Sequence, residues 1–149
     1  MYNVKLVEPR NSKEYEAYYN FRWQMLRRPW NQSEGTEKDD KERGAIHLMA
    51  LLNDRIIGCG RGHFNSTTQA QIRYMAVAEN FRNNGIGTQI LVELEKKLVE
   101  QGAMEIILKA REKAVHLYER QGYHVFKEGD VMFGEIMHFW MKKYLKNES

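Results

Sequence analysis

The chain of 149 residues has a single cysteine, Cys59, and only two prolines. One cysteine excludes an intramolecular disulfide, and a metal site built on cysteine would need ligands of other kinds. No apolar run approaches the roughly 20 residues that span a bilayer, and residues 1–10 lack the pattern of a secretory signal. We therefore expect a cytoplasmic protein without a membrane partner.

The chain also lacks a strong excess of charge of one sign. It has 23 Lys and Arg against 20 Asp and Glu, which gives a formal net charge of +3. An excess this small does not predict nucleic acid as a partner unless the cations cluster. The length suits one domain, so we expect a single domain over residues 1–149 with one core.

Hydrophobic periodicity predicts the elements of the first half. A strand at residues 3–7 precedes a helix that begins after Asn11 and ends near Pro29. Residues 31–43 contain no large apolar side chain, so we expect a surface loop of the kind that often contacts substrate. Short polar turns then separate three antiparallel strands, at residues 46–52, 55–64 and 69–77.

The second half alternates between helix and strand, as an α/β unit does. We expect a helix from residue 86 that ends at Gly102, a strand at 104–109, a short helix at 112–121, and strands that begin at 123 and 136.

The segment Arg82-Asn83-Asn84-Gly85-Ile86-Gly87-Thr88 joins a predicted strand to a predicted helix. Backbone N–H groups at such a helix N-terminus form an anion site, and glycine lets a ligand approach the backbone. A dinucleotide loop would need glycine at Ile90, and a nucleoside triphosphate loop would need Lys directly after Gly87. On spacing alone, an anion site and a tight turn without a ligand are equal alternatives.

Two motifs carry a resemblance to the GNAT family of N-acetyltransferases. Arg82, Gly85 and Gly87 match the family's Gln/Arg-x-x-Gly-x-Gly/Ala signature, and residues 114–123 are similar to its Ala-x-x-x-Tyr-x-x-x-Gly-Phe/Tyr segment. The resemblance implies an α+β fold with three α/β/α layers, the acyl-CoA N-acyltransferase fold. Its mixed, mainly antiparallel sheet would have six to seven strands and splay between the fourth and fifth.

The resemblance also implies acetyl coenzyme A (acetyl-CoA) as cosubstrate, with no metal. The strand edge at Met75, Ala76 and Val77 would pair with the pantetheine amides as an added strand does. The pyrophosphate would lie on Arg82, Asn83, Asn84, Gly85, Ile86, Gly87 and Thr88, with Tyr118 also beside the cofactor. Three cations come just after the predicted fifth strand: Lys109, Arg111 and Lys113. They either contact the nucleotide phosphates or are solvated charges.

Acetyl transfer requires a neutral amine to attack the thioester carbonyl and a proton for the departing sulfur. The family match makes Tyr118 the expected acid, because an unperturbed tyrosine pKa of about 10 keeps it protonated at neutral pH. A backbone N–H near Val77 is the expected donor to the carbonyl oxygen.

The general base is not decided by the sequence. Gln71 stands where some family members carry a glutamate, so Glu79, His63 and His47 remain as candidates. A water chain, or an amine that arrives deprotonated, is an equal alternative. His138 either lines the acceptor side or is structural.

We expect the acceptor to be a primary amine of a small molecule, because no second domain is predicted that could recognise a large partner. Arg22, Arg27, Arg28 and Trp30, with the loop to Arg43, would form the acceptor side; the arginines indicate an acidic substrate or are solvated. A protein N-terminus or lysine is the alternative acceptor. A regulatory module that binds acyl-CoA without turnover is the alternative from another class. Homodimers are common in the family, so a dimer is open.

Overall fold

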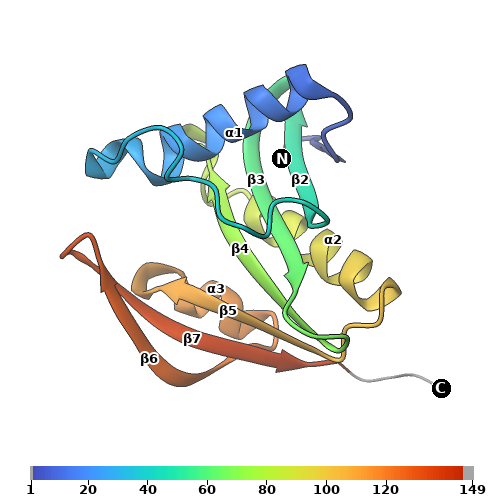
Figure 1. Ribbon diagram of the computed structural model, residues 1–149, viewed down its shortest axis with the longest axis vertical. Coiled ribbons are helices and arrows are strands. Elements are labelled where there is room, and N and C mark those ends of the chain that lie inside the picture. Colours follow the sequence, from blue (N-terminus) through green and yellow to red (C-terminus); the bar gives the residue numbers. More distant parts are fainter. Residues whose placement is uncertain (1, 146–149) are drawn as a thin grey trace.

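The computed structural model describes residues 2–145, which form a seven-stranded sheet with helices on both faces (Figure 1). The strands are β1 (Lys5–Val7), β2 (Ile46–Leu52), β3 (Arg55–Phe64), β4 (Gln69–Val77), β5 (Glu105–Arg111), β6 (His124–Met132) and β7 (Ile136–Tyr144). The helices are α1 (Ser12–Leu26), α2 (Ile86–Glu100) and α3 (Val115–Arg120), with single 3₁₀ turns η1 (Arg28–Trp30), η2 (Glu79–Phe81) and η3 (Glu112–Ala114). No helix of this part of the chain is long and apolar enough to cross a membrane.

The strand order is β1-β2-β3-β4-β5-β7-β6, and every neighbouring pair is antiparallel except β4 and β5. The parallel pairing of β4 with β5 runs only from Gln69 and Glu105 to Ile72 and Leu108. Beyond that point the two strands diverge, which opens the sheet toward the left of Figure 1. The predicted mixed sheet and its splay between the fourth and fifth strands are thereby confirmed.

Helix α2 covers one face of the sheet with a fully buried apolar stripe, formed by Ile86, Ile90, Leu91, Leu94 and Leu98. Burial of each such side chain contributes about 1.5–3 kcal/mol. Glycine on the facing strand β3 leaves room for the helix. A Cβ on Gly60 would lie 2.6 Å from Met75 Sδ and 2.8 Å from Ile90 Cγ2. Glycine on β3 therefore lets α2 lie close enough to the sheet to fix its N-terminus beside β4.

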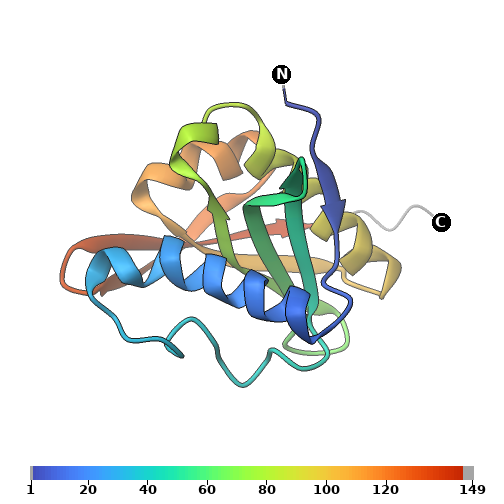
Figure 2. The same ribbon diagram turned by 90° about the horizontal axis from the view of Figure 1, so that it is seen from above.

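Helix α1 covers the opposite face (Figure 2). It begins as predicted, since Asn11 Oδ1 accepts a hydrogen bond of 2.9 Å from the Glu14 amide. Its buried residues are Tyr18, Arg22 and Leu26, one turn apart. Arg22 is therefore buried between α1 and the sheet, whereas we expected it to face an acceptor.

Candidate active site

A cavity of about 290 Å³ lies where β4 and β5 diverge. Its origin is a bulge in β4: the β3–β4 register shifts between Cys59 and Arg61, and Tyr74 on the facing strand has φ of 61°. A bulge bends its strand, so β4 leaves β5 here. The wall is formed by Leu26, Arg27, Gln71, Ile72, Arg73, Tyr74, Met75, Leu108, Lys109, Ala110, Arg111, Ala114, Tyr118, Met132, His138 and Trp140.

The N-terminus of α2 presents backbone donors without partners. Gly85 is the N-cap residue and supplies no side-chain cap, with φ of 76° that glycine adopts without strain. Within residues 2–145 the amides of Ile86, Gly87 and Thr88 meet no acceptor. Three aligned donors at the positive end of a helix dipole are suited to a phosphate.

The turn that leads into α2 is ordered by its own polar groups. Asn84 Nδ2 donates to the carbonyls of Phe81 (3.2 Å) and Arg82 (2.9 Å), and Arg82 Nε donates to Val77 O (3.3 Å). Asn83 adopts the left-handed conformation with φ of 64°. These contacts hold the segment from Arg82 to Thr88 against the end of β4.

Space beside Gly87 is open toward the splay. A Cβ there would meet nothing closer than Val77 Cγ2 at 3.7 Å and Leu117 Cδ1 at 3.9 Å. Protein packing therefore does not require glycine at this position. A ligand that approaches the helix between the end of β4 and α3 would require it.

The edge of β4 that faces the splay lacks a partner strand beyond Ile72. The Ala78 amide donates to Ile57 O on β3 at 2.8 Å. Because successive amides of a strand point to opposite sides, the Val77 amide points into the splay. Met75, two residues earlier, lies on the cavity wall, and Ala76 pairs with Cys59 on β3.

Tyr118 of α3 lies on the same wall as Met75, although the two residues are far apart in the chain. Burial raises the pKa of its hydroxyl to about 12, and the nearby Arg111 cation opposes this only in part. The hydroxyl therefore stays protonated throughout the physiological pH range.

The candidate bases are not gathered around this wall. Glu79 is exposed in η2, and neither it nor His63 lines the cavity. His63 Nδ1 accepts a hydrogen bond of 2.9 Å from Arg61 Nη2, so a proton on its ring resides on Nε2. Burial first, and then Arg61, lowers the His63 pKa. Both ring nitrogens of His47 are also hydrogen bonded: Nε2 donates to Glu42 O (2.8 Å) and Nδ1 accepts from the Tyr18 hydroxyl (2.8 Å).

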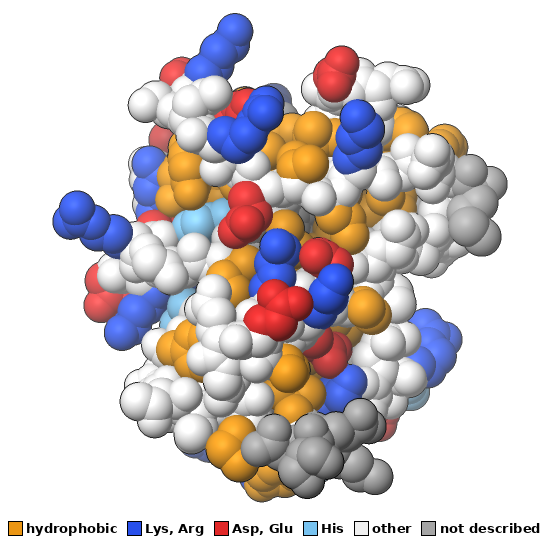
Figure 3. Space-filling model, turned by 90° about the vertical axis from the view of Figure 1, so that its right-hand side faces the viewer, with side chains coloured by type: hydrophobic (Ala, Val, Ile, Leu, Met, Phe, Trp, Pro, Cys, Tyr) orange, Lys and Arg blue, Asp and Glu red, His pale blue; other side chains and the backbone are white. Residues whose placement is uncertain are grey.

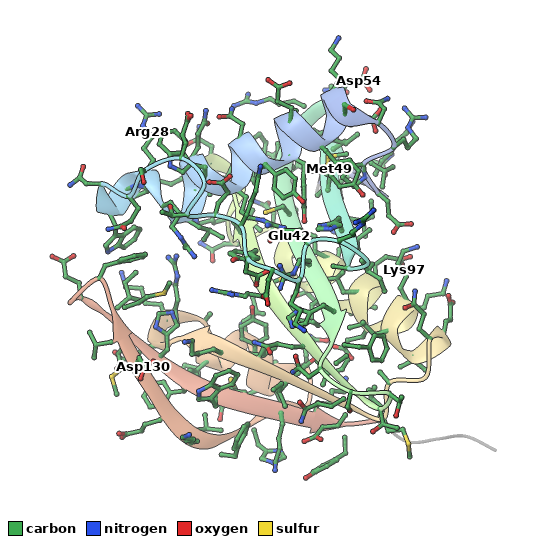
Figure 4. The ribbon with its side chains drawn as sticks, viewed as in Figure 1. Arg28, Glu42, Met49, Asp54, Lys97 and Asp130 are labelled. Carbon is green, nitrogen blue, oxygen red and sulfur yellow. The ribbon has the colours of Figure 1, made fainter. Side chains whose placement is uncertain are left out.

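The loop between η1 and β2 is held on the sheet by buried ion pairs. Arg61, fully buried on β3, donates to Asp39 Oδ2 at 2.9 Å and to Glu42 Oε2 at 2.8 Å. Arg22 binds the other Glu42 oxygen at 2.9 Å. Figure 4 shows Glu42 on the loop where it crosses this face of the sheet. The loop that we expected from its lack of apolar residues is therefore anchored by its charges.

Arginine guanidinium groups surround the ring of Tyr74 at the bulge. Their central carbons lie 4.1 Å (Arg22), 4.5 Å (Arg73), 5.0 Å (Arg61) and 5.7 Å (Arg27) from the ring centroid. These cation–π contacts stabilise a backbone conformation that costs an L-residue roughly 1–2 kcal/mol. Arg73 and Tyr74 lie outside both sequence motifs. The signal that could have located Arg73 is its period-two spacing from Gln71 on β4.

Aromatic contacts connect η1, which follows α1, with the turn between β6 and β7. Trp30 lies 6.3 Å from Phe133 between ring centroids, and the Arg27 guanidinium lies 5.5 Å from the Phe133 ring. Arg27 lies on the cavity wall, and Trp30 contacts the wall residue Arg111; their role on the acceptor side stays a prediction. Arg22 instead forms an ion pair with Glu42, and Arg28 is exposed beyond the end of α1 (Figure 4).

Residues 15–123 match the pattern of the acetyltransferase (GNAT) family, which is most of the chain. The chain belongs to the GNAT family. It is therefore an acetyltransferase of the coenzyme A-dependent type that the motifs at Arg82–Thr88 and residues 114–123 indicate.

Known GNAT proteins resemble this one along almost its whole length. The uncharacterized N-acetyltransferase YjcF of Bacillus subtilis (strain 168) is 26% identical over 140 residues, which cover 94% of this chain and 99% of YjcF. An aminoglycoside 6'-N-acetyltransferase complexed with coenzyme A has a TM-score of 0.78 at 16% identity, with 97% and 99% of the two chains covered. A GNAT family acetyltransferase from Elizabethkingia anophelis with acetyl-CoA bound has a TM-score of 0.74 at 19% identity, with 96% and 99% covered. Both solved structures are similar to this chain in fold.

Proposed function

We propose that this GNAT protein transfers an acetyl group from acetyl-CoA to a primary amine of a small molecule, within a ternary complex and as one domain. The observation that carries the proposal is the splay cavity, whose wall combines Tyr118 with the free edge of β4 next to the open N-terminus of α2. Acetyl-CoA supplies an acetyl group that is activated as a thioester.

The residues of the α2 N-terminus fit the pyrophosphate. Three amides without acceptors point out of the helix, and no side chain comes closer than 3.7 Å to the position of a Cβ on Gly87. Arg82 adds a cation next to them. We assign Arg82, Asn83, Asn84, Gly85, Ile86, Gly87 and Thr88 to this part of the cofactor, and the β4 edge at Met75, Ala76 and Val77 to its pantetheine arm.

Tyr118 is the proposed general acid. As the amine nitrogen bonds to the carbonyl carbon and the C–S bond breaks, Tyr118 gives its hydroxyl proton to the sulfur. Its pKa, raised to about 12, supports this role because the proton is present at neutral pH. The Val77 amide donates to the carbonyl oxygen, at no cost in reorganisation because β3 holds the strand in place.

The proton of the attacking amine leaves through water in this proposal. Glu79 and His63 do not line the cavity, and the Nδ1 lone pair of His63 is occupied by Arg61. Their role as base stays a prediction. Substitution of each by Gln tests it, since a base in direct contact contributes about 10²–10⁴-fold to the rate.

A small acceptor is favoured over a protein N-terminus by the small volume of the cavity. A volume of about 290 Å³ is at the lower end of small-molecule sites.

The test is release of the coenzyme A thiol from acetyl-CoA across a panel of primary amines. Tyr118→Phe removes the acid, and we expect kcat to fall about 10²-fold with the KM for acetyl-CoA little changed. Tyr123→Phe is the matched control: its ring lies 5.9 Å from that of Tyr118, and Tyr123 is not on the wall. Coenzyme A binding without turnover of any amine would instead support a regulatory module. Equal rates in Tyr118→Phe and wild type would contradict the mechanism.

A further inference from the structure

The splay cavity has a wall of one charge sign. Arg27, Arg73, Lys109 and Arg111 line it together with His138, and no Asp or Glu is among its wall residues. The face on the side of α2 is different: Figure 3 shows Lys and Arg interspersed with Asp and Glu there. The chain as a whole has a net charge of only +3, so four cations without a carboxylate on one wall are a local excess of positive charge.

The sheet itself turns these cations inward. Along β5, Ile106, Leu108 and Ala110 are buried on the side of α2, and the alternate residues point to the other side. Lys109 and Arg111 thus share the face of β5 opposite α2, and both line the cavity. Arg73 shares the wall from β4, and Arg27 reaches it from the end of α1.

Three of the four cations have no carboxylate partner in the described part of the chain. Arg73 binds Asp39 at 2.8 Å, whereas Arg27, Lys109 and Arg111 form no ion pair there. Arg111 is only partly exposed and stacks on Trp30, with its guanidinium carbon 5.2 Å from the ring. A half-buried guanidinium without an anion is unfavourable, and its planar fork matches a carboxylate or a phosphate.

We propose that the acceptor amine carries an anionic group, a carboxylate or a phosphate, which binds to Arg111. Lys109 and Arg27 lie beside the anion, and this inference rests on the proposed acetyl transfer. Trp30 and Trp140 form the apolar sides of this subsite; Lys109 Nζ lies 5.5 Å from the Trp140 ring. The amine of the same molecule then faces Tyr118 and the β4 edge. Polycationic amines are disfavoured, because they would bring further positive charge to the arginines.

The first test compares amines that differ only in the anion. The pairs are β-alanine with ethylamine and O-phosphoethanolamine with ethanolamine, with spermidine as the cationic amine. We expect kcat/KM to be at least about 10-fold higher for the anionic member of a pair, which corresponds to about 1.4 kcal/mol. The pair with the larger ratio distinguishes carboxylate from phosphate. Ratios near one, or a preference for spermidine, would overturn the inference and leave acetyl transfer intact.

Variants connect the preference to the proposed residues. Arg111→Gln is expected to raise KM for the anionic amines about 10-fold, with kcat and the KM for acetyl-CoA unchanged, and Arg111→Lys to restore part of the loss. Arg28→Gln is the matched control, since Arg28 is exposed and off the wall. A rise in the KM for acetyl-CoA alone would assign Arg111 to the cofactor phosphates and overturn the inference.

A binding measurement decides the case without turnover. Trp30 and Trp140 stand next to Arg111 and Lys109, so their fluorescence reports on an anion in the subsite. Titration with glutarate and with inorganic phosphate is expected to give a saturable change for at least one of them, weakened in Arg111→Gln and kept in Arg28→Gln. No saturable change with either anion, or the same change in Arg111→Gln, would contradict the subsite even if no amine is acetylated.

Discussion

Gly85 and Gly87 open the same helix, yet the structure gives them different reasons to be glycine. Gly85 has φ of 76°, where an L-residue costs roughly 1–2 kcal/mol, although a Cβ would meet no atom within 4 Å. Gly87 lies in the first turn of α2 with ordinary space around a Cβ, the nearest atom being at 3.7 Å. The first glycine is required by the backbone and the second, in our account, by the cofactor.

Alanine substitution is therefore expected to change stability in opposite directions. Gly87→Ala relieves the entropic cost of glycine in a helix and stabilises by about 0.5 kcal/mol, or roughly 1–2 °C in Tm for a chain of this size. Gly85→Ala forces the left-handed conformation on alanine and lowers Tm by roughly 3–6 °C. Thermal unfolding without ligand measures both.

Coenzyme A binding separates the two roles. A Cβ in a helix leans toward the N-terminus, so the methyl group added in Gly87→Ala would project toward the amides that we assign to the pyrophosphate. Loss of one charge-assisted hydrogen bond costs about 1.5–3 kcal/mol, and we expect the Kd of Gly87→Ala to rise about 10–100-fold by calorimetry. If Gly87→Ala is as stable as expected and binds coenzyme A as tightly as wild type does, the assignment of the cradle is wrong.

Other predictions concern groups whose pKa the fold shifts. Burial raises the Asp39 pKa, but the hydrogen bonds from Arg61 and from the Lys41 amide outweigh it and hold the pKa well below its usual range. Asp39→Asn should then lower the free energy of unfolding by about 2 kcal/mol at pH 7, and the gap to wild type should narrow below about pH 4, where the unfolded chain takes up the proton; a gap that stays constant in urea titrations down to pH 3 would contradict this ion pair. With the Tyr118 pKa raised to about 12, the acetylation rate should rise with pH as the amine loses its proton, and should not fall again below about pH 11; a fall centred near pH 10 that is absent in Tyr118→Phe would show an unshifted hydroxyl. Burial raises the pKa of the fully buried Cys59 thiol to about 12, so a thiol reagent should label the native protein only after unfolding, and rapid labelling would show that β3 opens.

The order and type of the elements could be predicted because their signals are local. The strands at 46–52, 55–64 and 69–77 have the predicted bounds, since polar turns and period-two patterns lie within a few residues of each other. The start of α2 at Ile86 follows from Gly85 directly before it. The short helix at 112–121 is divided into η3 and α3, a boundary that no residue type marks.

What escaped prediction depends on residues that meet only in the folded chain. Arg22 occupies a buried position of α1 because Glu42, twenty residues later, neutralises it at 2.9 Å. The bulge at Tyr74 depends on the register of β4 against β3, which the pattern of β4 alone does not contain. The sequence left two roles for Lys109 and Arg111, a contact to phosphate or a solvated charge. In the fold both line the cavity that opens where β4 and β5 diverge.

A crystal structure with bound coenzyme A tests the central claim most directly. We expect the pyrophosphate against the amides of Ile86, Gly87 and Thr88, the pantetheine along the free edge of β4, and the thiol in the splay cavity facing Tyr118. Coenzyme A bound elsewhere, or a thiol directed away from Tyr118, would contradict the account.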